Sequence, residues 1–94
     1  MSKAANKTIE LDHDGDIYDG AFYMNGWYAV TNANTASLVV EDASKIQVIR
    51  GVSAITNERM IYGPPLASPT YVNGLNTKTW TNIERVIIHV DRFM

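Results

Sequence analysis

The stretch LDHDGDIYDG, residues 11 to 20, holds the densest group of side chains suited to chemistry, with four aspartates and one histidine in ten positions. Such a group suits either a metal ion or a tight turn. An EF-hand calcium loop requires alternating oxygen ligands, glycine at the sixth position and a bidentate glutamate at the twelfth. The aspartates fit the start, but Ile17 and Tyr23 stand where glycine and glutamate belong. The pattern therefore predicts a polar turn between two strands, with Gly15 at positive φ.

The two histidines are the other candidates for catalysis or metal binding. A zinc site would require His13 and His89 to converge with carboxylates, yet both stand at alternating strand positions, where a half-buried histidine is expected. His13 beside Asp12 and Asp14 is the single acid–base cluster, and adjacent residues of a strand point to opposite faces. No serine elbow is present, and the chain has no cysteine. We expect no enzyme, no cofactor and no metal site; a structural metal in the acidic turn is the alternative.

Length and composition limit the class of protein. Ninety-four residues with 46% hydrophobic and 19% charged residues predict one folded domain. The net charge of −2 gives no general attraction to phosphate, so nucleic-acid binding would require a local patch. No apolar run approaches the roughly 18 residues of a membrane span, and no signal peptide is recognised, so we expect a cytoplasmic protein without membrane contact.

Short β-branched and aromatic runs predict an all-β fold with little helix. The run GAFYMNGWYAVT is interrupted at Asn25 and Gly26, which predicts either a hairpin turn or a bulge inside one long, bent strand. We expect a small, strongly bent antiparallel barrel, because closure removes the exposed edges of such a sheet. Within a single domain over 1–94, we expect an N-terminal tail at 1–7, a Pro- and Gly-rich loop or insertion at 63–79 and a closing strand at 82–93.

Two spacings carry a resemblance to a known family. Gly15, four residues, Gly20, one residue and Phe22 follow an apolar strand, and Ile49-Arg50-Gly51 ends a later one. Over residues 8 to 55 the chain resembles the Sm and Sm-like family of RNA-binding ring proteins, whose two motifs have this order. The resemblance implies an Sm-like barrel that assembles into a homo-oligomeric ring and binds RNA or single-stranded DNA, with a role in RNA or DNA processing.

The resemblance also implies a base-binding site. Arg50 and Gly51 match the family's Arg-Gly loop, while Asn32 and Asn34 stand where its Asp-x-x-Met-Asn loop should fall. From the residues themselves, the candidates for stacking on bases are Tyr23, Trp27, Tyr28, Tyr62, Tyr71 and Trp80. The candidates for phosphate contacts are Arg50, Lys45, Arg59 and Lys78. For each aromatic the structural alternative is core packing or a subunit interface, and for each cation it is a solvated surface charge.

A second hypothesis assigns no nucleic acid to this chain. It is a protein-interaction or structural module, such as a small virion or adaptor component, which docks a partner through its aromatic strand and Pro-rich arm. The two hypotheses differ in whether the protein binds nucleic acid at physiological salt.

Overall fold

The described part of the chain consists of β-strands and their connections. The computed structural model describes residues 3–5, 7–33, 35–55, 60–63 and 68–94. Its eight strands are β1 (Lys3–Ala5), β2 (Thr8–Leu11), β3 (Ile17–Thr31), β4 (Thr35–Glu41), β5 (Gln47–Ile55), β6 (Met60–Tyr62), β7 (Thr70–Thr81) and β8 (Ile83–Phe93). The described residues include no helix, so the predicted all-β class is confirmed.

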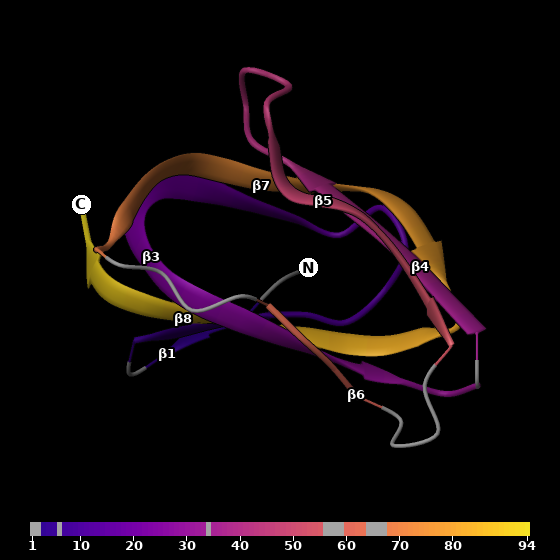
Figure 1. Cartoon of the computed structure of the whole chain (residues 1–94). Helices are drawn as coiled ribbons and strands as arrows, with labels where there is room; N and C mark the ends of the chain where they lie inside the picture. The colour runs from indigo at the N-terminus through magenta and orange to yellow at the C-terminus, as the bar shows by residue number, and fades with distance from the viewer. Residues whose placement is uncertain (1–2, 6, 34, 56–59, 64–67) are drawn as a thin grey trace.

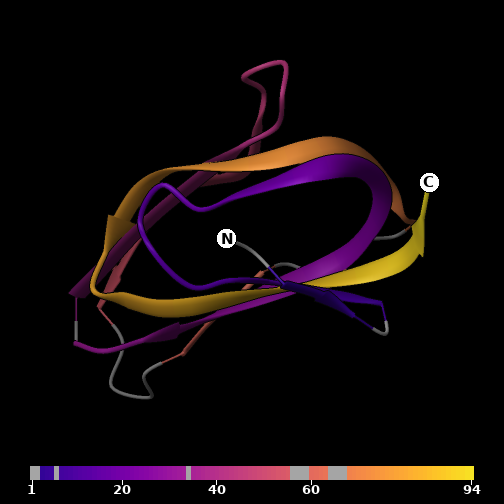
Figure 2. The ribbon, with the colours of Figure 1, turned by 180° about the vertical axis from the view of Figure 1, so that it is seen from behind.

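All eight strands form one antiparallel sheet in the order β1-β2-β8-β3-β7-β4-β5, with β6 added to β3. Figures 1 and 2 show the sheet curling into a flattened oval, with β7 on one side and β8 opposite. Among the described residues no pairing joins β5 to β1 or β2. The sheet is therefore strongly bent, as predicted, but it is not the closed barrel that we expected, and its end strands remain edges.

The longest strand, β3, gives the sheet its bend. Its first half pairs with β7 and its second half with β8 and β6, and the ribbon turns back sharply between the two halves (left in Figure 1). Met24 and Gly26 pair with consecutive residues of β8, so Asn25 between them is an extra residue. Met24 and Trp27 stand three positions apart, so strict alternation would put them on opposite faces. The extra residue of the bulge keeps both on the buried face. Of the two alternatives for Asn25 and Gly26, the structure shows the bulge in one long strand.

The concave face of the sheet carries the hydrophobic core. Alternate residues of the strands point into it, as expected for a sheet with one buried face. Its largest fully buried apolar side chains come from β2, β3, β4, β5 and β8: Ile9, Leu11, Phe22, Leu38, Val40, Ile49, Val86, Ile88 and Val90. Polar and aromatic side chains therefore meet solvent on the outer face of the sheet.

Two boundaries differ from the sequence prediction. The irregular segment predicted at 63–79 is wrong from Thr70 onward, because β7 begins there and lies between β3 and β4. All three prolines precede Thr70, and Gly74 stays within the strand by adopting a φ of 81°. The predicted tail at 1–7 contains β1, which pairs with β2. The segment predicted as a closing strand, 82–93, corresponds to β8, which lies between β2 and β3.

Candidate functional site

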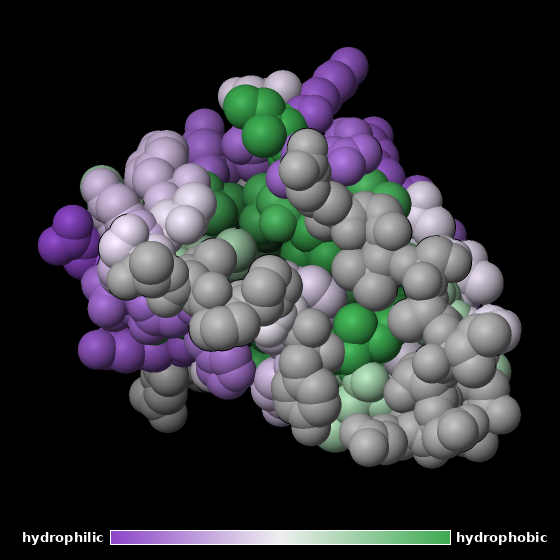
Figure 3. Space-filling model, in the orientation of Figure 1, coloured by the Kyte–Doolittle hydropathy of each residue, from purple (hydrophilic) through white to green (hydrophobic). Residues whose placement is uncertain are grey.

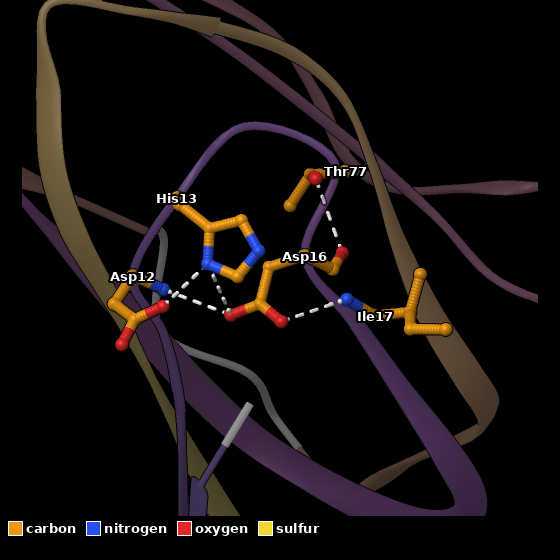
Figure 4. A network of polar contacts seen from close by, with 5 residues as sticks. All are labelled: Asp12, His13, Asp16, Ile17 and Thr77. Atoms are coloured by element: carbon orange, nitrogen blue, oxygen red, sulfur yellow. Dashed lines mark hydrogen bonds and ion pairs between the residues drawn. The ribbon is translucent and has the colours of Figure 1, made fainter. Parts of the chain in front are cut away.

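The acidic stretch forms the turn between β2 and β3 (Figure 4). The amide of Asp16 donates a hydrogen bond of 3.1 Å to the carbonyl of His13, and Gly15 has a φ of 80°. A type II turn requires positive φ at this third position, which favours glycine. The predicted turn, with Gly15 at positive φ, is confirmed.

Asp16 anchors this turn to the rest of the sheet. Its buried carboxylate accepts hydrogen bonds from the backbone amides of Asp12 at 3.0 Å and Ile17 at 2.9 Å. Its carbonyl accepts from the amide and the hydroxyl of Thr77 in β7, both at 3.1 Å. A buried polar group is stable only when it is hydrogen-bonded, and Asp16 meets that condition through its side chain and its backbone.

The same turn contains a cluster with the chemistry of a metal site. Asp12, His13 and Asp16 each offer a ligand atom within 4.8 Å of the others. Nδ1 of His13 lies 2.7 Å from Oδ1 of Asp12, and this hydrogen bond lowers the pKa of Asp12 below its usual 3.8. Both carboxylate oxygens of Asp16 already accept amide protons. We assign the cluster a structural role, since these contacts hold the side chain of Asp16 to the backbone at both ends of the turn.

The residues that match the Arg-Gly motif of the Sm-like family lie in a strand. The resemblance implies a loop at Arg50 and Gly51, but both residues belong to β5. They stand at a register shift in the pairing of β5 with β4, where β5 has one more residue than its partner. A β-bulge inside a continuous strand therefore replaces the expected loop.

The amide candidates do not join this position. Asn32 follows β3, and its backbone amide donates to the carbonyl of Asn82 at 3.0 Å. Three residues later, Thr35 pairs with Ile55, which stands five residues beyond Arg50 on β5. At about 3.3 Å per residue, Arg50 lies roughly 16 Å along the strand from the pair formed by Thr35 and Ile55. Asn32 is therefore not beside Arg50. Asn34 lies outside the described residues.

Two further candidates for nucleic-acid binding, Trp27 and Lys45, have structural roles. Trp27 is only 8% exposed and belongs to the core, so its ring does not offer a face for stacking. Lys45 is exposed in the hairpin between β4 and β5, where its amide donates to the carbonyl of Asp42 at 3.1 Å. Its φ of 65° completes a tight three-residue hairpin loop.

Tyr23, by contrast, belongs to an aromatic and cationic row on the outer face. It pairs with Tyr71 of β7 on one side and with Arg92 of β8 on the other. The rings of Tyr23 and Tyr71 meet edge to face at 5.6 Å, and the guanidinium carbon of Arg92 lies 4.5 Å from the Tyr23 ring centre. Both distances are typical of favourable contacts. Tyr71 is 53% exposed, so the row presents an aromatic surface to solvent.

This row, Tyr71, Tyr23 and Arg92, is called the aromatic row below. It lies where β7 begins and β8 ends, on the outside of the bend in β3 (left in Figure 1). Sequence reasoning named both tyrosines as stacking candidates but did not name Arg92, which falls near the end of the strand predicted at 82–93. Alternation along β8 alone would put Arg92 on the same side as the buried Val90, and it is the bulge at Asp91 that turns Arg92 to the outer face, so the sequence pattern gave no signal for it.

The other sequence candidates stay apart from this row. Trp80 is half-buried against the core, and Lys78 is exposed in the second half of β7. Tyr62 lies in β6, but its side chain, like the whole of Arg59, is outside the described parts.

A small cavity opens where the pairing of β3 with β7 is interrupted. It has a volume of about 230 Å³ and lies beside the bulge at Asp19 and Gly20. The hairpin between β4 and β5 borders it through Ala43, and hydrophobic residues are exposed beside that hairpin (top of Figure 3). Pockets for small-molecule ligands usually exceed about 300 Å³. The cavity therefore has room for one side chain or ring rather than for a cofactor.

Within the described parts of the chain, no helix is long and apolar enough to cross a membrane. A scan of the sequence against models of protein families gives no match, and searches of curated proteins and of solved structures give none either.

Proposed function

We propose that this protein binds single-stranded nucleic acid on the outer face of its sheet, through the aromatic row. The observation that carries the proposal is the alignment of Tyr71, Tyr23 and Arg92 on three adjacent strands, with Tyr71 half exposed. Proteins that bind single strands stack the bases on exposed aromatic rings and on arginine. The site differs from the Arg50 and Gly51 position that the resemblance to Sm-like proteins implies.

The charge of the protein sets the expected character of this binding. With a net charge of −2, the chain does not attract phosphates over long distances. Stacking should therefore supply most of the affinity, and few phosphate contacts should make the dependence on salt shallow. Bases in a duplex are already stacked on one another, so a single strand should be bound in preference to a duplex.

The test is a titration of labelled oligo(rU) and oligo(dT), followed by fluorescence anisotropy at physiological salt. Tyr71→Ala should weaken binding by about tenfold, because stacking contributes roughly 1–3 kcal/mol per base. Tyr71→Phe retains the ring and should bind like the wild type. Arg92→Ala should also reduce the slope of log affinity against log salt by about 0.7. Lys78→Ala removes an equal charge from the second half of β7, away from the aromatic row, and is the matched control for Arg92→Ala.

Absence of binding to either oligonucleotide would refute the proposal. So would a Tyr71→Ala variant that remains folded and binds as tightly as the wild type.

A protein-interaction module is the second candidate. It is favoured by exposed apolar side chains outside the aromatic row, with Ile46 65% and Met94 71% exposed.

The ring that the Sm-like resemblance implies would also be a protein interface. The strands β1 and β5 end the sheet, and each pairs on one side only in the described structure. Light scattering on a size-exclusion column measures the native mass. About five to seven subunits would support a closed ring, whereas a monomer would argue against it.

A further inference from the structure

We infer that the outer face holds a second stacking position, formed by Tyr28 and His89, so that a strand of several nucleotides lies along β3 and β8. This inference rests on the proposed function, because it extends the aromatic row into a track. The two parts of the track lie on the same two strands, on either side of the bulge at Asn25.

The second position resembles the first in its chemistry. The rings of Tyr28 and His89 have centres 5.6 Å apart and planes inclined by 38°, so the two rings meet in a tilted contact. His89 is exposed and Tyr28 is half-buried. The residues on either side of Tyr28 in the chain, Trp27 and Ala29, are buried, as alternation along a strand predicts. Tyr28 therefore points to the outer face, as Tyr23 does.

Gly26 leaves an open passage between the two positions. It pairs with His89, and a Cβ built at Gly26 would have no neighbour within 4 Å. Its φ is not among the positive values, so a larger residue would fit its backbone without strain. From Tyr23 to Gly26 the track covers roughly 10 Å at about 3.3 Å per residue, which is enough for more than one base. The absence of a side chain here lets a bound strand continue along the sheet.

Charged groups mark the two ends of the track. Arg92 lies in the aromatic row, and Arg85 pairs with Val30 beyond the second position; both arginines are exposed. Glu10 of β2 pairs with Ile87 of β8, which also pairs with Tyr28, so the half-buried Glu10 lies beside the second position. Phosphates should therefore lie nearer the arginines than the glutamate, and Glu10→Gln should strengthen binding by removing a repulsive charge.

The experiment compares oligo(dT) of two and six nucleotides by anisotropy competition, using the intact protein. The wild type should bind the six-nucleotide strand more tightly than the two-nucleotide strand. His89→Ala and Gly26→Leu should each weaken binding of the longer strand by about tenfold and leave the shorter one unchanged. Thr81→Leu adds the same side chain at the exposed end of β7 and is the control for Gly26→Leu. Circular dichroism checks that each variant is folded. If Gly26→Leu does not fold, His89→Ala alone tests the track.

The outcomes separate this inference from the proposed function. If Tyr71→Ala weakens both strands while His89→Ala and Gly26→Leu leave the longer one unaffected, the track is wrong and the aromatic row stands. If neither strand binds, both proposals fail. If neither strand binds and Tyr71→Ala instead abolishes self-association measured by light scattering, the face is a protein interface, and again both fail.

Discussion

Replacing Asp16 with alanine should lower the free energy of unfolding by about 2–3 kcal/mol. Its carboxylate accepts two backbone hydrogen bonds, from Asp12 at 3.0 Å and from Ile17 at 2.9 Å. Hydrogen bonds to a charged group contribute roughly 1.5–3 kcal/mol each, so the two together give about 3–6 kcal/mol. Desolvation of the buried carboxylate offsets part of this sum. Asp12 and Ile17 are exposed, so water can reach their amides once the carboxylate is removed. The expected loss of stability therefore lies near the lower end of that sum.

Urea denaturation, followed by circular dichroism, measures the loss. Asp16→Asn retains the shape but only one acceptor oxygen, so its stability should lie between those of the wild type and Asp16→Ala. A loss of less than about 0.5 kcal/mol in Asp16→Ala, as for an ordinary surface substitution, would refute the reasoning. The titrations are repeated with EDTA and with millimolar Ca²⁺ or Zn²⁺. Stabilisation of the wild type by a metal, absent in Asp16→Ala, would contradict the structural role assigned to the turn.

Three further predictions concern local geometry. Lys45→Gly should stabilise the protein by up to about 1 kcal/mol in urea denaturation, because Lys45 has a φ of 65° that glycine adopts freely; a lower stability would contradict this. Gly63→Ala should destabilise by about 1–3 kcal/mol in thermal unfolding, because its Cβ would overlap the indole ring of Trp27; an unchanged melting temperature would be the opposing result. His13→Ala should raise the pKa of Asp12 toward 3.8 in an NMR titration, since His13 is the main cause of its lowering. Because that pKa is lowered on folding, the associated stability is present above about pH 4 and is lost as pH falls through the folded value, and this acid-side loss should be smaller in the variant.

Local sequence patterns predicted the strands well where apolar and polar residues alternate. β2 follows this rule, with Ile9 and Leu11 buried and Thr8 and Glu10 half-buried, whereas β3 and β8 were indicated by their aromatic and β-branched residues. β7 was missed because prolines and glycines dominate the segment before and within its start. The sequence does not reveal that Gly74 takes a φ of 81° inside a strand that pairs on both sides.

The candidate site depended on information that a single sequence does not contain. Tyr23, Tyr71 and Arg92 are far apart in the chain, and only the register of β3 with β7 and β8 aligns them. Asp16 likewise depends on Thr77, sixty-one residues away, for the contact that fastens its turn to the sheet. Such pairings follow from the whole topology, whereas the positive φ of a glycine in an aspartate-rich turn is a local property that the sequence does predict.

The most direct test of the central claim is to map the binding surface by NMR. The ¹⁵N-labelled protein is titrated with oligo(dT) of six nucleotides, and amide shift changes are followed along the chain. We predict that the changes are concentrated in residues 23–28 of β3, in the start of β7 around Tyr71 and in residues 85–92 of β8. Changes concentrated instead around Arg50 of β5, or an absence of changes at saturating oligonucleotide, would contradict binding on the outer face.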